Sequence, residues 1–409
     1  MKIFNRKLKI TSSVLLTLCM VFVMTACAEN SSQSEKSQPA EQTTVQPTTM
    51  SAEEINDRKL DKFISDMTLE EKVGQMFFVR CPDEDAVKQV SKYNIGGYIL
   101  FGRDFDGKTK DEVVDDIHSY QNEADIPLLI GVDEEGGTVV RVSSNPNLRE
   151  TPFLSPKDTY ADGGWDAVKQ DAEEKADLLL SLGINVNLAP VCDMTSDEYG
   201  FMYDRSFSSD VDMENRYVRT VVETSKSKKL GTVLKHFPGY GNNSDTHTGI
   251  AYDDRDYSEF ENTDFKPFHQ GIESGADCIL VSHNIVNCMD SEYPASLSQK
   301  VHDILRNEFK FDGVIMTDDL IMDAITDFTG DEAAAVTAAK CGNDLLCCSS
   351  VDTQYPAVLE AVQNGEISKA QVDASVKRIL KWKQNLGIFN IDTYQKKVKS
   401  TEPTDTVGS

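Results

Sequence analysis

Eight short apolar runs, rich in β-branched residues, dominate the hydrophobic pattern of this chain. They are almost continuously apolar and do not alternate with polar positions, as is typical of parallel strands that are buried on both faces. The runs are Met76–Arg80, Ile95–Phe101, Pro127–Asp133, Ile184–Pro190, Gly231–His236, Ala276–Ser282, Gly313–Asp318 and Gly342–Cys347. The pattern therefore predicts eight strands of one parallel sheet.

Helical patterns fill most of the gaps between these runs. Capping boxes mark two helix starts, at Thr68-Leu69-Glu70-Glu71 and at Ser368-Lys369-Ala370-Gln371. Apolar residues at helical spacing predict further helices over Trp165–Leu182, Met213–Lys229, Gln299–Phe309 and Asp331–Lys340. Eight strands with helical crossovers predict an α/β fold of the (β/α)8 TIM-barrel type. A doubly wound open sheet is the competing fold, but the strand count and the chain length favour the barrel.

Residues 1–26 have the pattern of a signal peptide rather than of a folded segment. An apolar run from Ile10 to Met24, too short for a comfortable membrane span, follows the basic residues Lys2, Arg6, Lys7 and Lys9. Small residues then precede Cys27, and this resembles a bacterial lipoprotein signal in which Cys27 is lipidated. The alternative is an ordinary secretory signal followed by a chance cysteine.

The composition predicts the domain boundaries. Residues 27–52 are rich in Ser, Gln, Thr, Glu and Pro and contain no aromatic residue. They cannot bury enough apolar area to offset their ordering entropy, so we expect a disordered tether. Residues 53–390 are predicted to form one barrel, and residues 391–409 a polar C-terminal tail. Diacylated Cys27 would hold the barrel on the extracellular face of the bacterial cell membrane.

The charge and the cysteine content narrow the range of partners. The formal charge is −27, and it becomes −31 when residues 1–26 are removed, because they carry four basic residues and no acidic one. Such an acidic chain is not expected to bind nucleic acid or to contact a membrane through basic residues. Most cysteines outside the signal are expected to be buried apolar residues. No residues have the spacing of a metal site, so neither a metal nor a cofactor is expected.

Polar residues stand at the carboxyl ends of the predicted strands, where the active sites of barrels lie. They are Asp133 after the third run, Asp193 after the fourth, Lys235 and His236 in the fifth, His283 after the sixth, and Asp318 and Asp319 in and after the seventh. Carboxylates and cations therefore converge on one mouth, without a serine or thiol nucleophile motif. This mixture suits a neutral, polyhydroxylated ligand.

The stretch from Lys235 to His247 carries the densest candidate chemistry. Lys235-His236 ends an apolar run, and Asp245-Thr246-His247 follows on a glycine-rich loop. Residues i and i+2 of extended backbone face the same side, so Asp245 can accept a hydrogen bond from His247 and raise the basicity of its other ring nitrogen. A histidine titrates near neutral pH and can both donate and accept a proton. The alternative is a loop histidine without a catalytic role.

Four motifs in register give the sequence a specific resemblance. They are Asp133-Glu134-Glu135-Gly136-Gly137 with Arg141, Asp204-Arg205-Ser206-Phe207, Lys235-His236-Phe237-Pro238-Gly239 followed by Asp245-Thr246-His247, and Thr317-Asp318-Asp319-Leu320 at the end of the seventh run. In this order they resemble the β-N-acetylglucosaminidases of glycoside hydrolase family 3. The resemblance extends from about residue 64 to residue 389.

The resemblance implies a role for each matched residue. Asp318 matches the catalytic nucleophile of a retaining mechanism, and His247 the acid/base with Asp245 as its partner. The residues that match the sugar-binding positions are Asp133, Arg141, Arg205, Lys235 and His236. The alternatives are a helix-capping carboxylate for Asp318 and a structural ion-pair network for the sugar-binding set.

Two departures from the family pattern lie on the loop that carries His247. Tyr240 stands where the commonest pattern has a histidine. The link Asn242-Asn243-Ser244 is one residue shorter than in the enzymes that the sequence resembles. The shorter link changes how this loop aligns with the family pattern, and the match of His247 to the acid/base depends on that alignment.

The leading hypothesis is a surface-anchored, retaining, exo-acting β-N-acetylglucosaminidase. It would remove terminal β-linked N-acetylglucosamine from cell-wall fragments or other glycans. A β-glucosidase or β-xylosidase of the same family is the first alternative, although many of those have a second α/β domain that this sequence does not suggest. Phosphate as acceptor in place of water is a further alternative, and so is a non-catalytic sugar-binding lipoprotein.

Overall fold

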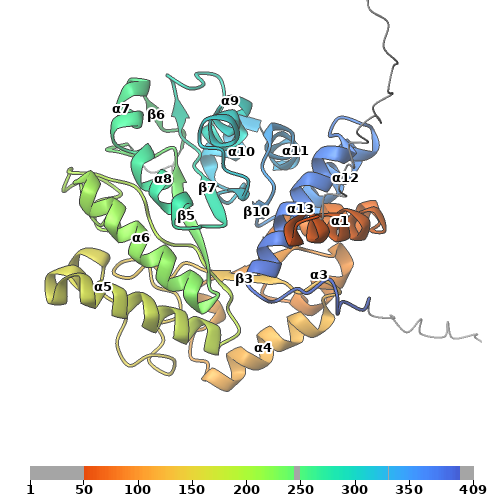
Figure 1. Ribbon diagram of the computed structural model, residues 1–409, viewed down its shortest axis with the longest axis horizontal. Coiled ribbons are helices and arrows are strands. Elements are labelled where there is room, and N and C mark those ends of the chain that lie inside the picture. The colour runs from red at the N-terminus through yellow and green to blue at the C-terminus, as the bar shows by residue number, and fades with distance from the viewer. Residues whose placement is uncertain (1–49, 244–248, 330, 397–409) are drawn as a thin grey trace, which may run out of the picture. The chain divides into compact units, whose positions relative to one another are not determined.

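Eight parallel strands form the centre of the protein, whose computed structural model describes residues 50–243, 249–329 and 331–396 (Figure 1). Around the sheet the order is β10-β1-β2-β3-β4-β5-β7-β9. The strands are β1 (Phe77–Arg80), β2 (Gly97–Leu100), β3 (Leu129–Val132), β4 (Val186–Asn187), β5 (Gly231–Phe237), β7 (Cys278–Val281), β9 (Val314–Thr317) and β10 (Leu346–Cys348). Each overlaps one of the eight predicted runs, and the two-stranded pair β6 (Tyr252–Asp253) and β8 (Ile285–Val286) was not predicted.

The sheet closes between β9 and β10. Leu345, next to β10, forms a parallel bridge with Met316 of β9. Its nitrogen donates to the Ile315 carbonyl at 3.1 Å, and its carbonyl accepts from the Thr317 nitrogen at 3.2 Å. Strands that follow one another in the chain are therefore neighbours around the whole sheet, and the predicted (β/α)8 barrel is confirmed.

The barrel interior is packed too tightly for larger side chains at some positions. All four residues of β2, β3, β7 and β9 are buried. Gly131 of β3 faces the ring of Phe78, and a Cβ there would lie 2.5 Å from Phe78 Cζ and 3.0 Å from Leu188 Cδ1. Only glycine fits at this position, because interiors pack at the density of organic crystals.

Helices surround the strands (Figure 1). They are α1 (Ala52–Ser65), α2 (Leu69–Gln75), α3 (Ala86–Tyr93), α4 (Lys110–Glu123), α5 (Pro156–Ser181), α6 (Val211–Lys228), α7 (Tyr257–Asn262), α8 (Phe265–Glu273), α9 (Gln299–Asp303), α10 (Asp323–Thr329), α11 (Asp331–Cys341), α12 (Val351–Gln363) and α13 (Lys369–Asn385). Short 3-10 turns cover Gly102–Asp104 and Ala295–Leu297, and a π-helical turn, Ile304–Glu308, continues α9. Helices α1 and α13 lie side by side although they come from opposite ends of the chain.

The helix starts confirm most of the predicted caps. Thr68 and Glu71 form the predicted reciprocal capping box. Ser368 accepts a hydrogen bond from the Gln371 nitrogen, but the Gln371 side chain donates to the Ala339 carbonyl at 2.6 Å, so the second half of that predicted box is replaced by a tertiary contact. Helix α5 begins at Pro156, before the predicted Trp165, and is kinked at Gly163 and Gly164.

The ends of the barrel differ slightly from the predicted boundaries. Helix α1 begins at Ala52 with Ser51 as its cap, so the fold starts just before residue 53. Within the first residues of the predicted polar tail, the Tyr394 ring contacts Phe63 at 5.0 Å between ring centroids. The predicted signal, Cys27 and nearly all of the tether lie outside the described residues. In the part of the chain that is described, no helix has the length and apolarity to cross a membrane.

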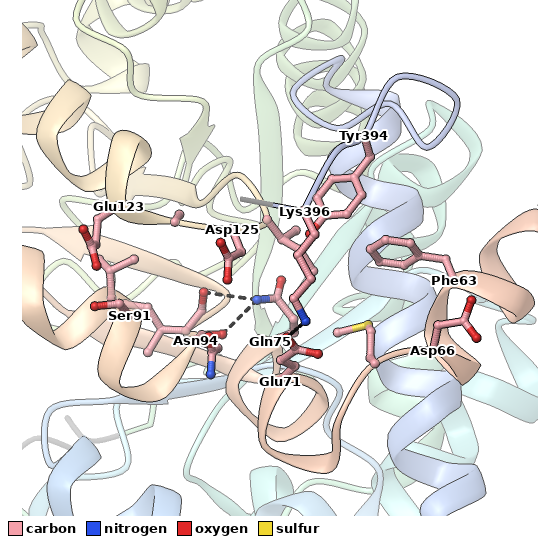
Figure 2. Close-up of a pocket in the computed structure, with 15 residues that line it drawn as sticks. Phe63, Asp66, Glu71, Gln75, Ser91, Asn94, Glu123, Asp125, Tyr394 and Lys396 are labelled. Atoms are coloured by element: carbon pink, nitrogen blue, oxygen red, sulfur yellow. Dashed lines mark hydrogen bonds and ion pairs between the residues drawn. The ribbon is translucent and has the colours of Figure 1, made fainter. Parts of the chain in front are cut away.

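A cavity of about 240 Å³ lies at the amino-terminal end of the barrel strands. Figure 2 shows Phe63, Gln75, Asn94, Tyr394 and Lys396 around it. Gln75 closes its floor by donating to the carbonyls of Asn94 and Ile95, at 2.8 and 3.3 Å. The cavity lies before β1 and β2, at the end of the barrel opposite to the polar residues at the carboxyl ends of the strands.

Candidate active site

A cavity of about 510 Å³ opens at the carboxyl ends of the strands, within the size range of small-ligand sites. Its lining brings together six of the residues predicted from sequence, which are Asp133, Arg141, Arg205, Lys235, His236 and Asp318. They come from β5, from the loops after β3 and β4, and from the turn after β9. The barrel therefore converts distant sequence positions into one site, as the fold predicts.

Lys235 lies at the centre of an ion network on one wall. Its Nζ is 2.7 Å from Asp133 Oδ1 and 2.6 Å from Glu135 Oε1. Arg205 donates to both oxygens of Glu135, from Nε at 2.9 Å and from Nη2 at 2.7 Å. Such a two-pronged pair fixes orientation as well as charge. Glu135 thus holds both cations in place.

Burial and charge act in opposite directions on this network. Burial by itself would raise the pKa of Glu135, but Arg205 and Lys235 hold that pKa well below its usual range. Burial would lower the pKa of Lys235, and the carboxylates of Asp133 and Glu135 raise it instead. Both groups are therefore ionised, and each depends on the other because a lone buried charge is costly.

His236 is oriented from both sides of its ring. Its Nδ1 lies 2.7 Å from Asp193 Oδ2, and its Nε2 lies 3.3 Å from Arg205 Nη2. An arginine can only donate, so Nε2 accepts and Nδ1 carries the hydrogen that Asp193 accepts. Asp193 also accepts from the backbone nitrogens of His236 and Tyr240, at 3.0 and 2.7 Å. This buried carboxylate fixes the ring and the start of the following loop.

Tyr240, the first departure from the family pattern, is a packing residue. Its side chain is buried, with its ring edge-on to His236 at 5.2 Å and to Phe201 at 5.9 Å. It thus packs beside the His236 ring.

Glu134 serves the backbone and not the cavity. Its carboxylate accepts from the nitrogens of Arg141, Val142 and Ser143, at 2.9, 2.7 and 3.3 Å. These bonds anchor the loop that carries Arg141 to the end of β3. Neighbouring residues of extended backbone face opposite sides, so Glu134 points away from the cavity that Asp133 and Glu135 line.

Asp318 and Asp319 form a turn at the end of β9. The Asp319 nitrogen donates to Asp318 Oδ1 at 2.8 Å, and Asp319 Oδ2 accepts from Ser349. Buried His283 places its Nδ1 2.7 Å from Ser296 Oγ and its Nε2 3.1 Å from the Asp319 carbonyl. Burial raises the pKa of Asp319. His283 therefore positions the turn that presents Asp318 to the cavity.

The predicted acid/base pair, Asp245 and His247, lies outside the described residues. The chain up to it is anchored, because Thr195 donates to Asn242 Oδ1 at 2.6 Å. The assignment of these two residues therefore remains a prediction from the sequence.

Sequence reasoning assigned no role in the site to Glu135, Asp193, Arg80 or Phe101. Glu135 was present in the quoted motif, and the same i, i+2 rule that was applied to Asp245 and His247 places it beside Asp133. Asp193 was noted at a strand end, but no local signal joins it to His236. Arg80 and Phe101 end the first two predicted strands and line the cavity.

The lining of the cavity mixes cationic and anionic side chains. Hydrogen-bond donors and carboxylates both line the cavity, and Asp318 reaches it from the end of β9, two strands along the barrel from β5 and Lys235. Among the residues placed by the structure, no group of His, Cys, Asp or Glu is arranged to hold a metal ion. Six of the seven cysteines there are buried, and Cys288 is exposed.

Comparison with known proteins agrees with the motifs. A family model described as the glycosyl hydrolase family 3 N-terminal domain matches residues 68–382. The chain is 32% identical over 273 residues to a β-hexosaminidase of Nitrosomonas eutropha, covering 65% of this chain and 77% of that protein. It is 31% identical over 286 residues to a β-hexosaminidase of Hydrogenovibrio crunogenus, covering 68% of this chain and 79% of that protein.

A solved structure is similar to this chain in its fold as well as in its sequence. The family 3 β-N-acetylglucosaminidase from Paenibacillus sp. superposes with a TM-score of 0.74 at 29% identity, over 83% of this chain. The chain spans 66% of that protein, just under two thirds.

Proposed function

The chain belongs to glycosyl hydrolase family 3, and on that premise we propose that it is a retaining, exo-acting β-N-acetylglucosaminidase. One observation carries the proposal: Asp318, directly after β9, lines the same cavity as the network of Lys235 and Arg205. The relatives named β-hexosaminidases support the acetamido sugar as substrate.

The proposed reaction has two steps. Asp318 attacks the anomeric carbon while His247 protonates the departing glycosidic oxygen, which gives a covalent glycosyl-enzyme. His247 then removes a proton from water, which attacks the anomeric carbon and releases Asp318. Asp245 orients His247 in both steps. The product keeps the β configuration, because two inversions occur at the same carbon.

The ion network supplies the sugar contacts in this proposal. Lys235 has three N–H donors, and two point to Asp133 and Glu135, so the third is available to a sugar hydroxyl. Asp133 accepts from hydroxyls through its partly exposed carboxylate. Because the network is already assembled, it costs little reorganisation when the sugar binds.

The location is proposed on sequence grounds alone. Lipidation of Cys27 would place the enzyme on the outer face of the bacterial cell membrane, within reach of cell-wall fragments and other glycans. Metabolic labelling with a fatty-acid probe, compared between the wild-type chain and Cys27→Ala, tests this. Equal labelling of the two would contradict it.

The activity is tested with chromogenic β-linked N-acetylglucosaminide and β-glucoside. We expect turnover of the acetamido sugar, and a loss of at least about 10³-fold in Asp318→Asn, because the covalent route is removed. A higher kcat/KM on the glucoside would favour a β-glucosidase instead. Full activity in Asp318→Asn would contradict the assignment of the nucleophile.

A further inference from the structure

Arg255 follows β6 and lies beside both ends of the loop that carries Asp245 and His247. This loop leaves the barrel after β5 and returns at β6, which pairs with β8. The proposed reaction needs His247 within hydrogen-bond reach of the departing glycosidic oxygen, because a proton is transferred only at that distance. The positions of the two loop ends therefore affect the rate.

The Arg255 guanidinium contacts both ends of the loop. Its Nη2 donates to the Gly239 carbonyl at 3.2 Å, near the start of the loop. Its Nε and Nη2 donate to Asp253 Oδ2 at 3.0 and 2.8 Å, at the end of the loop. Its Nη1 donates to Oδ2 of Asp264, just before α8, at 2.9 Å. One planar group therefore joins the two loop ends to each other and to α8, mostly through charge-assisted bonds, which are stronger than neutral ones.

The backbone at the start of the loop fits closely against this group. Gly239 and Gly241 have φ angles of +122° and +53°, in the left-handed region that favours glycine. A Cβ on Gly239 would lie 2.3 Å from Asp264 Oδ1, and a Cβ on Gly241 would lie 2.7 Å from Arg255 Cζ. The two glycines thus allow the chain to pass directly against the ion pair of Arg255 and Asp264.

The surroundings of Arg255 fix its position. Its partners Asp253 and Asp264 are only 5% and 3% exposed, and its Cζ lies 4.2 Å from the centroid of the Phe260 ring. Burial by itself would lower the pKa of Arg255, but the two carboxylates raise it. In the described part of the chain, Arg255 does not line the cavity that contains Asp318. It can therefore act on the reaction only through the loop.

We propose that Arg255 is a positioning residue for the acid/base, which holds both ends of the loop so that His247 reaches the departing oxygen. This inference rests on the proposed glycosidase function and adds a residue to its mechanism. Loss of Arg255 should slow the step that needs proton transfer to the leaving group. It should affect the attack of Asp318 much less.

The test compares kcat/KM on a disaccharide with a terminal β-linked N-acetylglucosamine and on an aryl N-acetylglucosaminide, whose leaving group needs little protonation. Arg255→Gln should lower the ratio of disaccharide to aryl kcat/KM about tenfold or more, because small displacements of a catalytic group are costly. Arg255→Lys keeps the charge without the fork of donors and should lower the ratio less. Arg306→Gln, which breaks a similarly buried ion pair with Asp344, should leave it within about twofold.

An equal loss on both substrates in Arg255→Gln would show a purely structural role and overturn the proposal. If Arg255→Gln does not fold, the ratio in Arg255→Lys decides, and an unchanged ratio there overturns it.

If the wild type turns over neither substrate, the glycosidase function fails, and hydrogen exchange then tests the contacts of Arg255 separately. Amides of the peptide from Gly239 to Asp253 should exchange about tenfold faster in Arg255→Gln than in the wild type or in Arg306→Gln. Unchanged exchange of this peptide would show that Arg255 does not hold the loop.

Discussion

Glu135 is the residue on which the charge balance of the cavity depends. It contacts both Lys235 and Arg205 and is almost fully buried. In Glu135→Gln the two cations keep only Asp133 as a close carboxylate, so we expect a loss of about 3–5 kcal/mol in the free energy of unfolding. Chemical denaturation measures this, with the exposed Glu223→Gln as the matched control. A change below about 1 kcal/mol would show that the network is not coupled.

The acid/base role of His247 can be tested with substrates whose leaving groups differ in their need for protonation. If it is the acid/base, His247→Ala should lose much more kcat/KM on a natural glycoside than on an aryl glycoside, whose leaving group needs little protonation. Steady-state kinetics on the two substrates measure the difference. Equal losses would count against the acid/base assignment.

The sequence predicted which residues line the site but not all of their contacts. Asp133, Arg141, Arg205, Lys235, His236 and Asp318 could be placed from strand ends and motifs, because a barrel gathers those ends. The partnership of Asp193 with His236 could not, because it joins the loop after β4 to strand β5 across 43 positions.

At the scale of elements, helix α13 carries a buried lysine against α2. Lys383 Nζ donates to Gln75 Oε1 at 2.7 Å, and burial lowers the pKa of Lys383 to about 7. Between this pH and the ordinary lysine pKa near 10.4, the unfolded chain binds more protons than the folded one. Stability should therefore rise with pH across this window, by about 1.4 kcal/mol per unit.

Replacement of Lys383 by Met should remove this part of the pH dependence. Denaturation curves at pH 7, 8 and 9 for Lys383→Met and for the exposed Lys369→Met of the same helix give the comparison. The same slope in the Lys383→Met and Lys369→Met chains would contradict the role of burial.

The elements were predictable to the extent that their patterns are local. The eight apolar runs predicted eight strands, since buried strands must be apolar on both faces. The start of α5 was missed because Gly163 and Gly164 interrupt its pattern, and the helix continues through a kink. The missing half of the Ser368 box has a tertiary cause, because Gln371 binds α11 instead.

At the scale of the whole molecule, the two ends of the domain meet at the amino-terminal end of the barrel strands. Tyr394 packs on Phe63 of α1 and on Phe389, with ring centroids 5.0 and 5.7 Å apart. Tyr394→Ala should therefore lower stability by about 1–3 kcal/mol, whereas Tyr199→Ala, at a fully exposed site, should not. Thermal denaturation of both variants measures this. Equal stability of the wild type and Tyr394→Ala would show that this packing does not stabilise the fold.

The central claim is that Asp318 forms a covalent bond with the sugar. A slow fluorinated N-acetylglucosaminide should trap this species, and peptide mass spectrometry then locates the bond. The account predicts one adduct, on the peptide that contains Asp318 and on that residue, with loss of activity in proportion to labelling. An adduct on Asp319 or on any other residue, or turnover with inversion of the anomeric carbon and no adduct, would contradict it.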